Sequence, residues 1–335
     1  MYLLPRPQEM LLQDNVFYVD YTAEICIDPE ASPEWLHYAS LLQKEIEQDT
    51  GFHLNINRNL PVFQTPSILL KSTSGHSQQE YTLRIRESGI LLTASSNSGM
   101  LYAIQTLRQI IRQEGACLPG LDIHDFPVIS NRGLYYDVTR SRIPTLSYLK
   151  KMADTLSFYK INQLHLYIEH TYMFRNLSEV WRDDTPLTSS DILELDRYCA
   201  DLGIELVPSI ASFGHLYKIL RTKSFRHLCE REDLCEEPFG FIDRMEHHTI
   251  DVSNEESFSF IWSLIEEYLP LFRSDKFNIC GDETFDLGTG KSHELAEREG
   301  TQQLYIQYIK KLCDALVTHG KTPMFWGDIV CKSPE

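Results

Sequence analysis

Two patterns of apolar and polar residues divide the chain near residue 125. In the first part, apolar and polar residues alternate over 81–85, which predicts a half-buried strand. The apolar run 89–94 predicts a second strand, joined to the first by a short hairpin connection. Apolar residues recur on one helical face over about 33–48 and 99–113, so both segments are predicted to be helices. Residues 1–125 are therefore predicted to form a small α+β domain.

Residues 126–335 show a second pattern, in which short apolar runs alternate with amphipathic helices. This alternation is typical of parallel βαβ units, in which each helix connects two neighbouring strands. Five strands in this order fit either an open doubly wound sheet or part of a (β/α)8 barrel. The apolar runs lie near 133–138, 161–168, 204–210, 276–280 and 323–327, and the helices near 145–159, 188–202, 254–271 and 301–319.

Polar or aromatic residues follow each of the five predicted strands. A barrel gathers the C-terminal ends of its strands around one mouth, where barrel enzymes keep their catalytic groups. Chance would scatter such residues over both ends, so their coincidence predicts a site at the mouth. They are Asp137 and Arg140 after the first strand, Glu169 and His170 after the second, His215 after the third, Asp282 and Glu283 after the fourth, and Trp326 and Asp328 after the fifth.

The neighbouring carboxylates Asp282 and Glu283 carry the most chemical information. Two ionised acids repel, so their pKa values tend to separate, which suits an acid and a base. Acids, a histidine, an arginine and a tryptophan around one mouth suit a sugar, because aromatic faces stack on it while charged groups bind its hydroxyls. Glycosidases usually place two carboxylates on opposite sides of the bond, but sequence neighbours in a strand point in different directions. The exception is substrate-assisted hydrolysis, in which the substrate's own 2-acetamido group attacks the anomeric carbon.

Several motifs together resemble the family 20 glycoside hydrolases, the β-N-acetylhexosaminidases. Residues 132–140 are similar to the family's Arg-Gly-x-x-x-Asp-x-x-Arg, and residues 281–283 match its Gly-Asp-Glu. Residues 4–8 and 102–107 resemble the small α+β domain that precedes the family's barrel. The resemblance covers nearly the whole chain. It implies a (β/α)8 TIM-type barrel and the removal of terminal β-linked N-acetylhexosamine by a retaining, substrate-assisted mechanism through an oxazolinium, without a cofactor.

The resemblance also implies roles for single residues. Glu283 would be the general acid and then the base, and Asp282 would orient the acetamido group and stabilise the oxazolinium. Arg132 would bind sugar hydroxyls away from the bond that is cut. His215 would support the acid, and Trp326 would form part of the wall around the acetamido methyl.

The chain departs from the family's pattern at three places. Glu169 and His170 stand where the family usually has two Asp residues, so Glu169 is expected to replace the acid that pairs with His215. Phe213 stands where Pro is usual, as in a bacterial branch of the family. Glu169, His170 and Asp328 are further candidates for substrate binding. The chain also ends after the fifth strand of an expected eight, so we expect a fragment that is unstable or inactive alone, because two sheet edges would be open.

Charge and composition narrow the classes of partner. A net charge of −17 disfavours nucleic acid and anionic membrane surfaces, and no apolar run approaches the length of a membrane span. Residues 1–7 do not resemble a signal peptide, and eight scattered cysteines are typical of reduced thiols, so a cytoplasmic location is expected. The histidines and cysteines of 227–248 have no standard zinc spacing, so no metal is expected.

Two other functions fit the same residues. One is a glycosidase for another sugar, with Glu283 and an unidentified nucleophile. The other is a truncated, non-catalytic carbohydrate-binding protein, whose sugar binding would be unchanged by Glu283→Gln. The pattern leaves open the choice between N-acetylglucosamine and N-acetylgalactosamine, the linkage and the oligomeric state.

Overall fold

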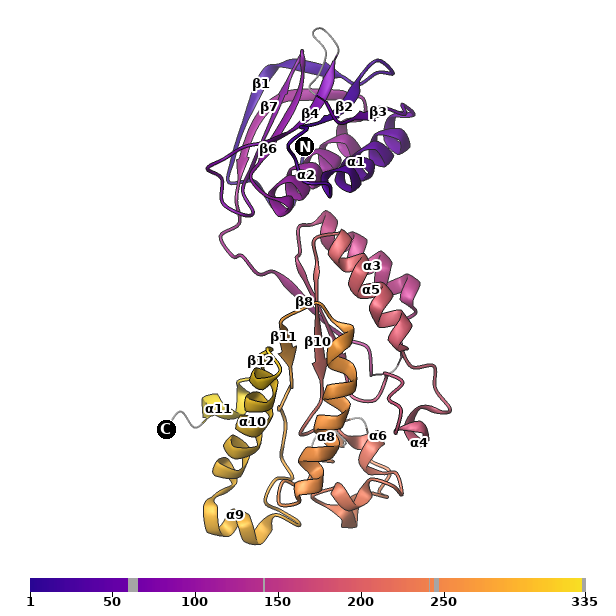
Figure 1. Cartoon of the computed structure of the whole chain (residues 1–335), viewed down its shortest axis with the longest axis vertical. Helices are drawn as coiled ribbons and strands as arrows, with labels where there is room; N and C mark the ends of the chain where they lie inside the picture. The colour runs from indigo at the N-terminus through magenta and orange to yellow at the C-terminus, as the bar shows by residue number, and fades with distance from the viewer. Residues whose placement is uncertain (60–65, 141, 241, 244–246, 333–335) are drawn as a thin grey trace. The chain divides into compact units, whose positions relative to one another are not determined.

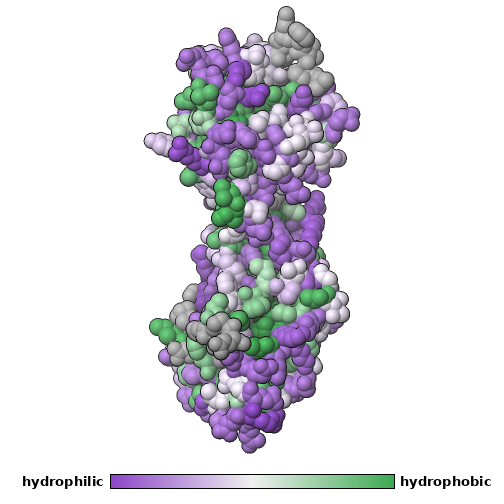
Figure 2. Space-filling model, turned by 90° about the vertical axis from the view of Figure 1, so that its left-hand side faces the viewer, coloured by the Kyte–Doolittle hydropathy of each residue, from purple (hydrophilic) through white to green (hydrophobic). Residues whose placement is uncertain are grey.

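The structure, a computed structural model, describes residues 1–59, 66–140, 142–240, 242–243 and 247–332 (Figure 1). The chain divides into two compact units. The first comprises Met1–Arg132, Ala153–Asn162 and Asp201–Ile204, and the second comprises Gly133–Met152, Gln163–Ala200 and Glu205–Glu335. The molecular face shown in Figure 2 is mostly hydrophilic, with hydrophobic residues in small groups.

The first unit contains a mixed sheet, in which the described residues form seven strands in the order β1-β7-β5-β6-β4-β2-β3. The predicted hairpin is confirmed, because β5 and β6 pair antiparallel through a two-residue turn. Strands β6, β4, β2 and β3 are mutually parallel. The bounds are β1 Glu9–Tyr18, β2 Glu24–Ile27, β3 Asn55–Asn57, β4 Ser67–Ser72, β5 Tyr81–Arg86, β6 Gly89–Ala94 and β7 Cys117–Asp125.

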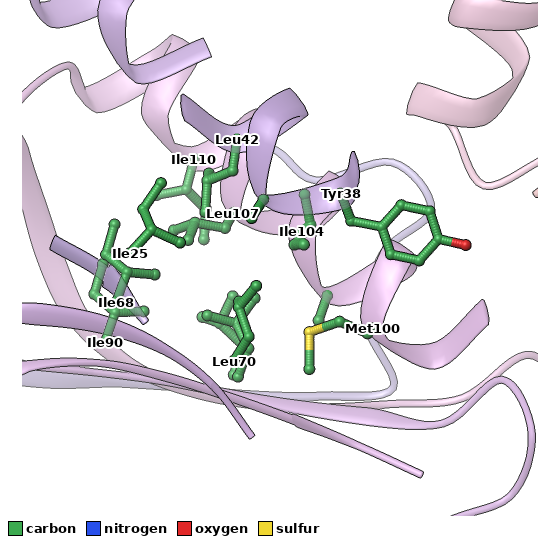
Figure 3. Close-up of a cluster of buried hydrophobic side chains, with 14 of the residues drawn as sticks. Ile25, Tyr38, Leu42, Ile68, Leu70, Ile90, Met100, Ile104, Leu107 and Ile110 are labelled. Carbon is green, nitrogen blue, oxygen red and sulfur yellow. The ribbon is translucent and has the colours of Figure 1, made fainter. Parts of the chain in front are cut away.

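Helices α1 (Trp35–Thr50) and α2 (Asn97–Glu114) pack together on one face of this sheet. The Ser96 hydroxyl caps α2 by accepting the Gly99 N–H at 3.1 Å, and α1 ends at Gly51, whose left-handed backbone suits glycine. Figure 3 shows the buried core between the two layers, where aliphatic side chains of the strands meet those of the helices. The helical faces predicted from apolar periodicity are the faces that this core buries.

The second unit contains a parallel sheet in the order β12-β11-β10-β9-β8. Each strand pairs with the next one in the chain, as in a barrel, whereas a doubly wound sheet reverses direction at a switch point. Strand β9 is buried along its whole length, which accounts for its continuous apolar run. The bounds are β8 Gly133–Asp137, β9 Gln163–Ile168, β10 Glu205–Ile210, β11 Lys276–Asn278 and β12 Thr322–Met324.

Helices connect these strands, so the expected fold class is confirmed as α/β, with a mixed sheet followed by five parallel strands of a partial TIM-type barrel. The longer helices are α3 Leu146–Phe158, α5 Ser189–Asp201, α8 Glu255–Tyr268 and α10 Thr301–Thr318. The shorter ones are α4 Ser178–Trp181, α6 Tyr217–Leu220, η1 Arg226–Leu228, η2 Glu232–Leu234, η3 Leu269–Leu271, α9 His293–Glu299 and α11 Asp328–Lys332. Within the described ranges, none of the helices has the length and apolar character that a membrane crossing needs.

Candidate active site

Asp282, Glu283 and His215 form the centre of the candidate site, in the second unit. His215 Nε2 lies 3.2 Å from Asp282 Oδ2 and 3.3 Å from Glu283 Oε2, so one imidazole contacts both carboxylates. The His215 side chain is 3% exposed, whereas those of Asp282 and Glu283 are 23% and 39% exposed. The histidine is therefore a buried support beneath two carboxylates that solvent can reach.

An unusual backbone turns these side chains toward each other. Non-glycine residues seldom adopt a positive φ, yet φ is 60° at His215, 58° at Cys280 and 49° at Glu283. Between the last two, Gly281 has a φ of 80°. Such conformations cost free energy and concentrate at functional sites, where the surrounding structure holds them. The turn after β11 thus brings neighbouring residues, which would diverge in a strand, to the same imidazole.

Gly214 allows the segments after β10 and β11 to approach closely. A Cβ atom at this position would lie 2.8 Å from the Asp282 carbonyl oxygen and 3.1 Å from that of Glu283. The first distance is shorter than real Cβ contacts, the second is tighter than nine in ten of them, and the opposing atoms belong to the backbone, which cannot rotate away. Glycine at 214 is therefore needed for His215 to reach the two acids.

A second group of side chains surrounds Arg140. Its Nη1 donates to Asp137 Oδ2 at 2.8 Å, and its Nη2 lies 3.2 Å from Glu169 Oε1 and 3.5 Å from His215 Nδ1. The Tyr167 hydroxyl also donates to Glu169 Oε1 at 3.0 Å. Burial raises the pKa of Glu169 above its ordinary value, although the charges of Arg140 and His215 oppose the shift. Arg140 thus joins the ends of β8, β9 and β10.

Arg140, Glu169 and His215 line one side of a cavity of about 340 Å³. The segments after β8, β9 and β10 supply the rest of its wall, which includes an ion pair of 2.8 Å between Asp184 and Lys218. The long loop after β10 contributes Tyr217 and Lys218 to this wall, and its residues 241 and 244–246 lie outside the described residues. The cavity is lined by Thr139, Arg140, Arg142, Ile143, Glu169, His170, Thr171, Asp184, Thr185, His215, Tyr217 and Lys218.

The remaining candidate residues are placed differently. His170 is buried and lines the cavity, with its Nδ1 3.8 Å from Glu169 Oε2. The Trp326 ring packs edge-on against Tyr135, with 4.9 Å between the ring centroids, and its backbone N–H donates to the Cys280 carbonyl at 2.9 Å. Trp326 therefore lies beside the segment that leads to the two acids. Asp328 is exposed at the start of α11.

Arg132, the candidate for binding sugar hydroxyls, belongs to the first unit. Its guanidinium donates to the Lys160 carbonyl at 2.9 Å, to the Ile129 carbonyl at 2.7 Å and to the Tyr102 hydroxyl at 2.9 Å. The arginine that lines the cavity is Arg140, the last residue of the same motif. The position of Arg140 after the first barrel strand was the signal that could have assigned it.

Further polar contacts were not apparent from the sequence. Tyr167 was interpreted only as part of an apolar strand, although it lies in β9 two residues before Glu169, a spacing that places two side chains on the same side of an extended chain. Within the described part of the chain, no group of three or more His, Cys, Asp or Glu residues is arranged to hold a metal ion.

The pKa of His215 predicts how its contribution to stability depends on pH. Burial alone would lower this pKa, but the hydrogen bond to Asp282 and the charges of Asp282 and Glu169 raise it above the ordinary 6.5. A raised pKa means that the folded state binds the proton more tightly than the unfolded state does. The stabilisation is therefore fully present below about pH 6.5 and is lost as the pH rises through the raised value.

We expect His215→Gln to lower the melting temperature more at about pH 5.5 than at about pH 8.5. Thermal melts of the wild type and the variant at the two values measure this difference. His293→Gln is the matched control, because His293 is an exposed histidine in α9 with a carboxylate partner, Glu297. A deficit that is equal at both pH values, or larger at the alkaline one, would contradict the assignment.

Comparison with known proteins adds independent information. Residues 130–334 match the family model described as the catalytic domain of glycosyl hydrolase family 20, and residues 1–126 match the model of domain 2 of the same family. The β-hexosaminidase of Porphyromonas gingivalis is 24% identical over 98% of this chain and 45% of its own length. The chain thus spans about half the length of that relative.

Solved structures show the same fold. A chitobiase of Flavobacterium johnsoniae matches with a TM-score of 0.82 at 22% identity, over 98% of this chain and 52% of its own. An exo β-N-acetylglucosaminidase of Vibrio harveyi, solved in complex with N-acetylglucosamine, matches with a TM-score of 0.80 at 22% identity, over 97% of this chain and 54% of its own. At these identities the likeness establishes the fold.

Proposed function

The chain belongs to glycosyl hydrolase family 20, and on that premise we propose that it removes terminal β-linked N-acetylhexosamine from glycosides or oligosaccharides by a retaining, substrate-assisted mechanism. The observation that carries the proposal is the single imidazole shared by Asp282 and Glu283. The shared contact holds the two carboxyl groups as close neighbours, and in substrate-assisted hydrolysis neither of them has to act as the nucleophile. The arrangement suits one acid and one orienting carboxylate, with the nucleophile supplied by the substrate.

Glu283, the more exposed of the two carboxyl groups, donates a proton to the leaving oxygen as the glycosidic bond breaks. The carbonyl oxygen of the 2-acetamido group attacks the anomeric carbon at the same time and forms an oxazolinium ring. Glu283, now ionised, takes a proton from water as the water attacks the anomeric carbon. The ring opens, and the sugar leaves with its original anomeric configuration.

Asp282 orients the acetamido group through its other oxygen. Among the described residues none donates a hydrogen bond to Asp282 Oδ1, which is buried. A buried carboxylate oxygen gains most from a donor, and the N–H of an acetamido group is a donor of the right kind. As this nitrogen becomes positive in the oxazolinium, the charged acceptor binds it more strongly, which lowers the barrier.

The other residues hold the sugar. Arg140, in place of Arg132, and Glu169 bind hydroxyls of the terminal sugar from the cavity beside His215. Trp326 offers an aromatic face to the acetamido methyl, from its position beside the turn that carries the acids. The bound N-acetylglucosamine in the Vibrio harveyi structure supports an amino sugar as the substrate class.

Hydrolysis of an aryl β-N-acetylglucosaminide, compared with the matching β-glucoside, tests the proposal in the product of the gene's full reading frame. Turnover of the acetamido substrate alone is expected, because only that substrate carries its own nucleophile. Turnover of both at similar rates would indicate a glycosidase with a protein nucleophile. Sugar binding without turnover of either would indicate a carbohydrate-binding protein. The matching galactosaminide, assayed in parallel, measures the preference between the two amino sugars.

A further inference from the structure

We propose that Asp286 is a positioning residue that holds His215 against Glu283, an inference that rests on the proposed function. Asp286 lies three residues after Glu283, on the same loop, and is 4% exposed. Its Oδ2 accepts the backbone N–H of His248 at 3.1 Å, and its Oδ1 lies 2.9 Å from His247 Nδ1. One carboxylate of the loop that carries the acid thus binds the end of the long loop after β10.

Two further hydrogen bonds connect the segment that begins at His248 to the residues on either side of His215. The carbonyl oxygen of His248 accepts the N–H of Leu216, the residue after His215, at 3.3 Å. The same stretch is joined to the chain before His215, because the Ile250 N–H donates to the Phe213 carbonyl at 3.0 Å. His215 is therefore flanked on both sides by hydrogen bonds to the strip 248–250. Asp286 binds the first residue of that strip.

These contacts form a closed series that includes the candidate acid, Glu283. Asp286, three residues after Glu283, accepts a hydrogen bond from the His248 backbone, and the His248 carbonyl accepts one from Leu216. His215, next to Leu216 in the chain, contacts Glu283 through its imidazole at 3.3 Å. His248 has a φ of 69° and a fully buried side chain, so its backbone depends on outside contacts to keep its direction. Weakening the Asp286 contact would shift His215 relative to Glu283.

Glu230 provides a matched control. It is a second buried carboxylate that joins the same two loops, and it accepts from the Gly290 N–H at 2.9 Å, the Ser292 N–H at 3.1 Å and the Ser292 hydroxyl at 2.7 Å. These contacts lie farther along the loop from Glu283 than Asp286 does. The backbone N–H of Glu230 donates to the Thr249 carbonyl of the strip at 3.0 Å, and Glu230→Gln keeps that bond, so this substitution would weaken the loop packing through the side-chain contacts with 290–292.

The test compares two N-acetyl-β-glucosaminides in the full-reading-frame protein. A phenyl leaving group needs a proton from Glu283, whereas a dinitrophenyl group departs without one. Asp286→Asn is expected to lower kcat/KM, which reports the step that breaks the glycosidic bond, by about tenfold or more for the phenyl substrate and by less than about twofold for the dinitrophenyl substrate. Glu230→Gln is expected to affect both substrates alike.

Equal effects of Asp286→Asn on the two substrates, or no effect on either, would overturn the inference. If the Asn variant does not fold, Asp286→Glu decides the matter, because it keeps the charge but displaces the oxygens, and the same difference between the substrates is expected. Activity of the wild type distinguishes failure of the proposed function from failure of the inference about Asp286. If the wild type hydrolysed neither substrate, the proposed function would be rejected, and the role of Asp286 with it.

Discussion

Glu283→Gln is expected to lower kcat for the phenyl N-acetyl-β-glucosaminide by about 10²- to 10⁴-fold, the usual contribution of a general acid. The amide has nearly the size of the acid, but it cannot give a proton to the leaving oxygen. The loss in kcat/KM should be much smaller for the dinitrophenyl substrate, because kcat/KM reports the first step and that step needs no proton for this leaving group. Steady-state kinetics on both substrates, with the full-reading-frame protein, measure the difference.

Glu294→Gln is the control for this substitution, because Glu294 is an exposed carboxylate in the first turn of α9. It makes the same chemical change in the second unit, away from the contacts of His215, and should leave kcat within about twofold. If Glu283→Gln kept most of the activity on the phenyl substrate, another group would have to be the acid.

Asp282→Asn is expected to lower kcat by about 10²- to 10³-fold, on the scale of removing one group that stabilises the transition state. In the proposed mechanism the acetamido N–H binds Asp282 Oδ1, which is buried and receives no hydrogen bond from the described residues. The neutral amide accepts more weakly and cannot balance the positive oxazolinium. Because the interaction strengthens in the transition state, kcat and kcat/KM should fall together.

The loss of activity in Asp282→Asn should not depend on the leaving group, whereas the loss in Glu283→Gln should. Phenyl and dinitrophenyl substrates should lose similar factors in the step that forms the ring, because both need the acetamido group in place. Asp183→Asn, at an exposed carboxylate paired with Arg182, is the matched control. An Asp282→Asn variant within about tenfold of the wild type would show that the acetamido group is oriented by another residue.

Local patterns were enough to predict most of the architecture. The hairpin of β5 and β6 follows from alternating burial, and the buried strand β9 follows from its continuous apolar run. Both predictions succeed because the order of apolar and polar residues in a strand follows which of its side chains are buried. The choice between a barrel and a doubly wound sheet was different, since it depended on strand order, which no single segment records.

Residue type alone could not show where the side chains of one motif would lie. Arg132 and Arg140 stand at the two ends of the same nine-residue motif, yet the first binds carbonyls of its own unit and the second lines the cavity. A strand separates them, so they emerge at opposite ends of β8. Residue type alone favours both equally, because a guanidinium suits a sugar hydroxyl and a backbone carbonyl alike.

The sequence by itself determined the alternation of strands and helices, the carboxylates at the end of the fourth barrel strand and the family, because each is a local pattern of residue types. Only the tertiary structure decided that Asp282 and Glu283 share one imidazole and that Asp286 reaches the strip beside His215. The physical reason is that these contacts depend on left-handed turns at 215, 248, 280 and 283 and on loops that meet in space. Packing between distant segments holds such turns in place, and a residue's neighbours in the chain do not reveal it.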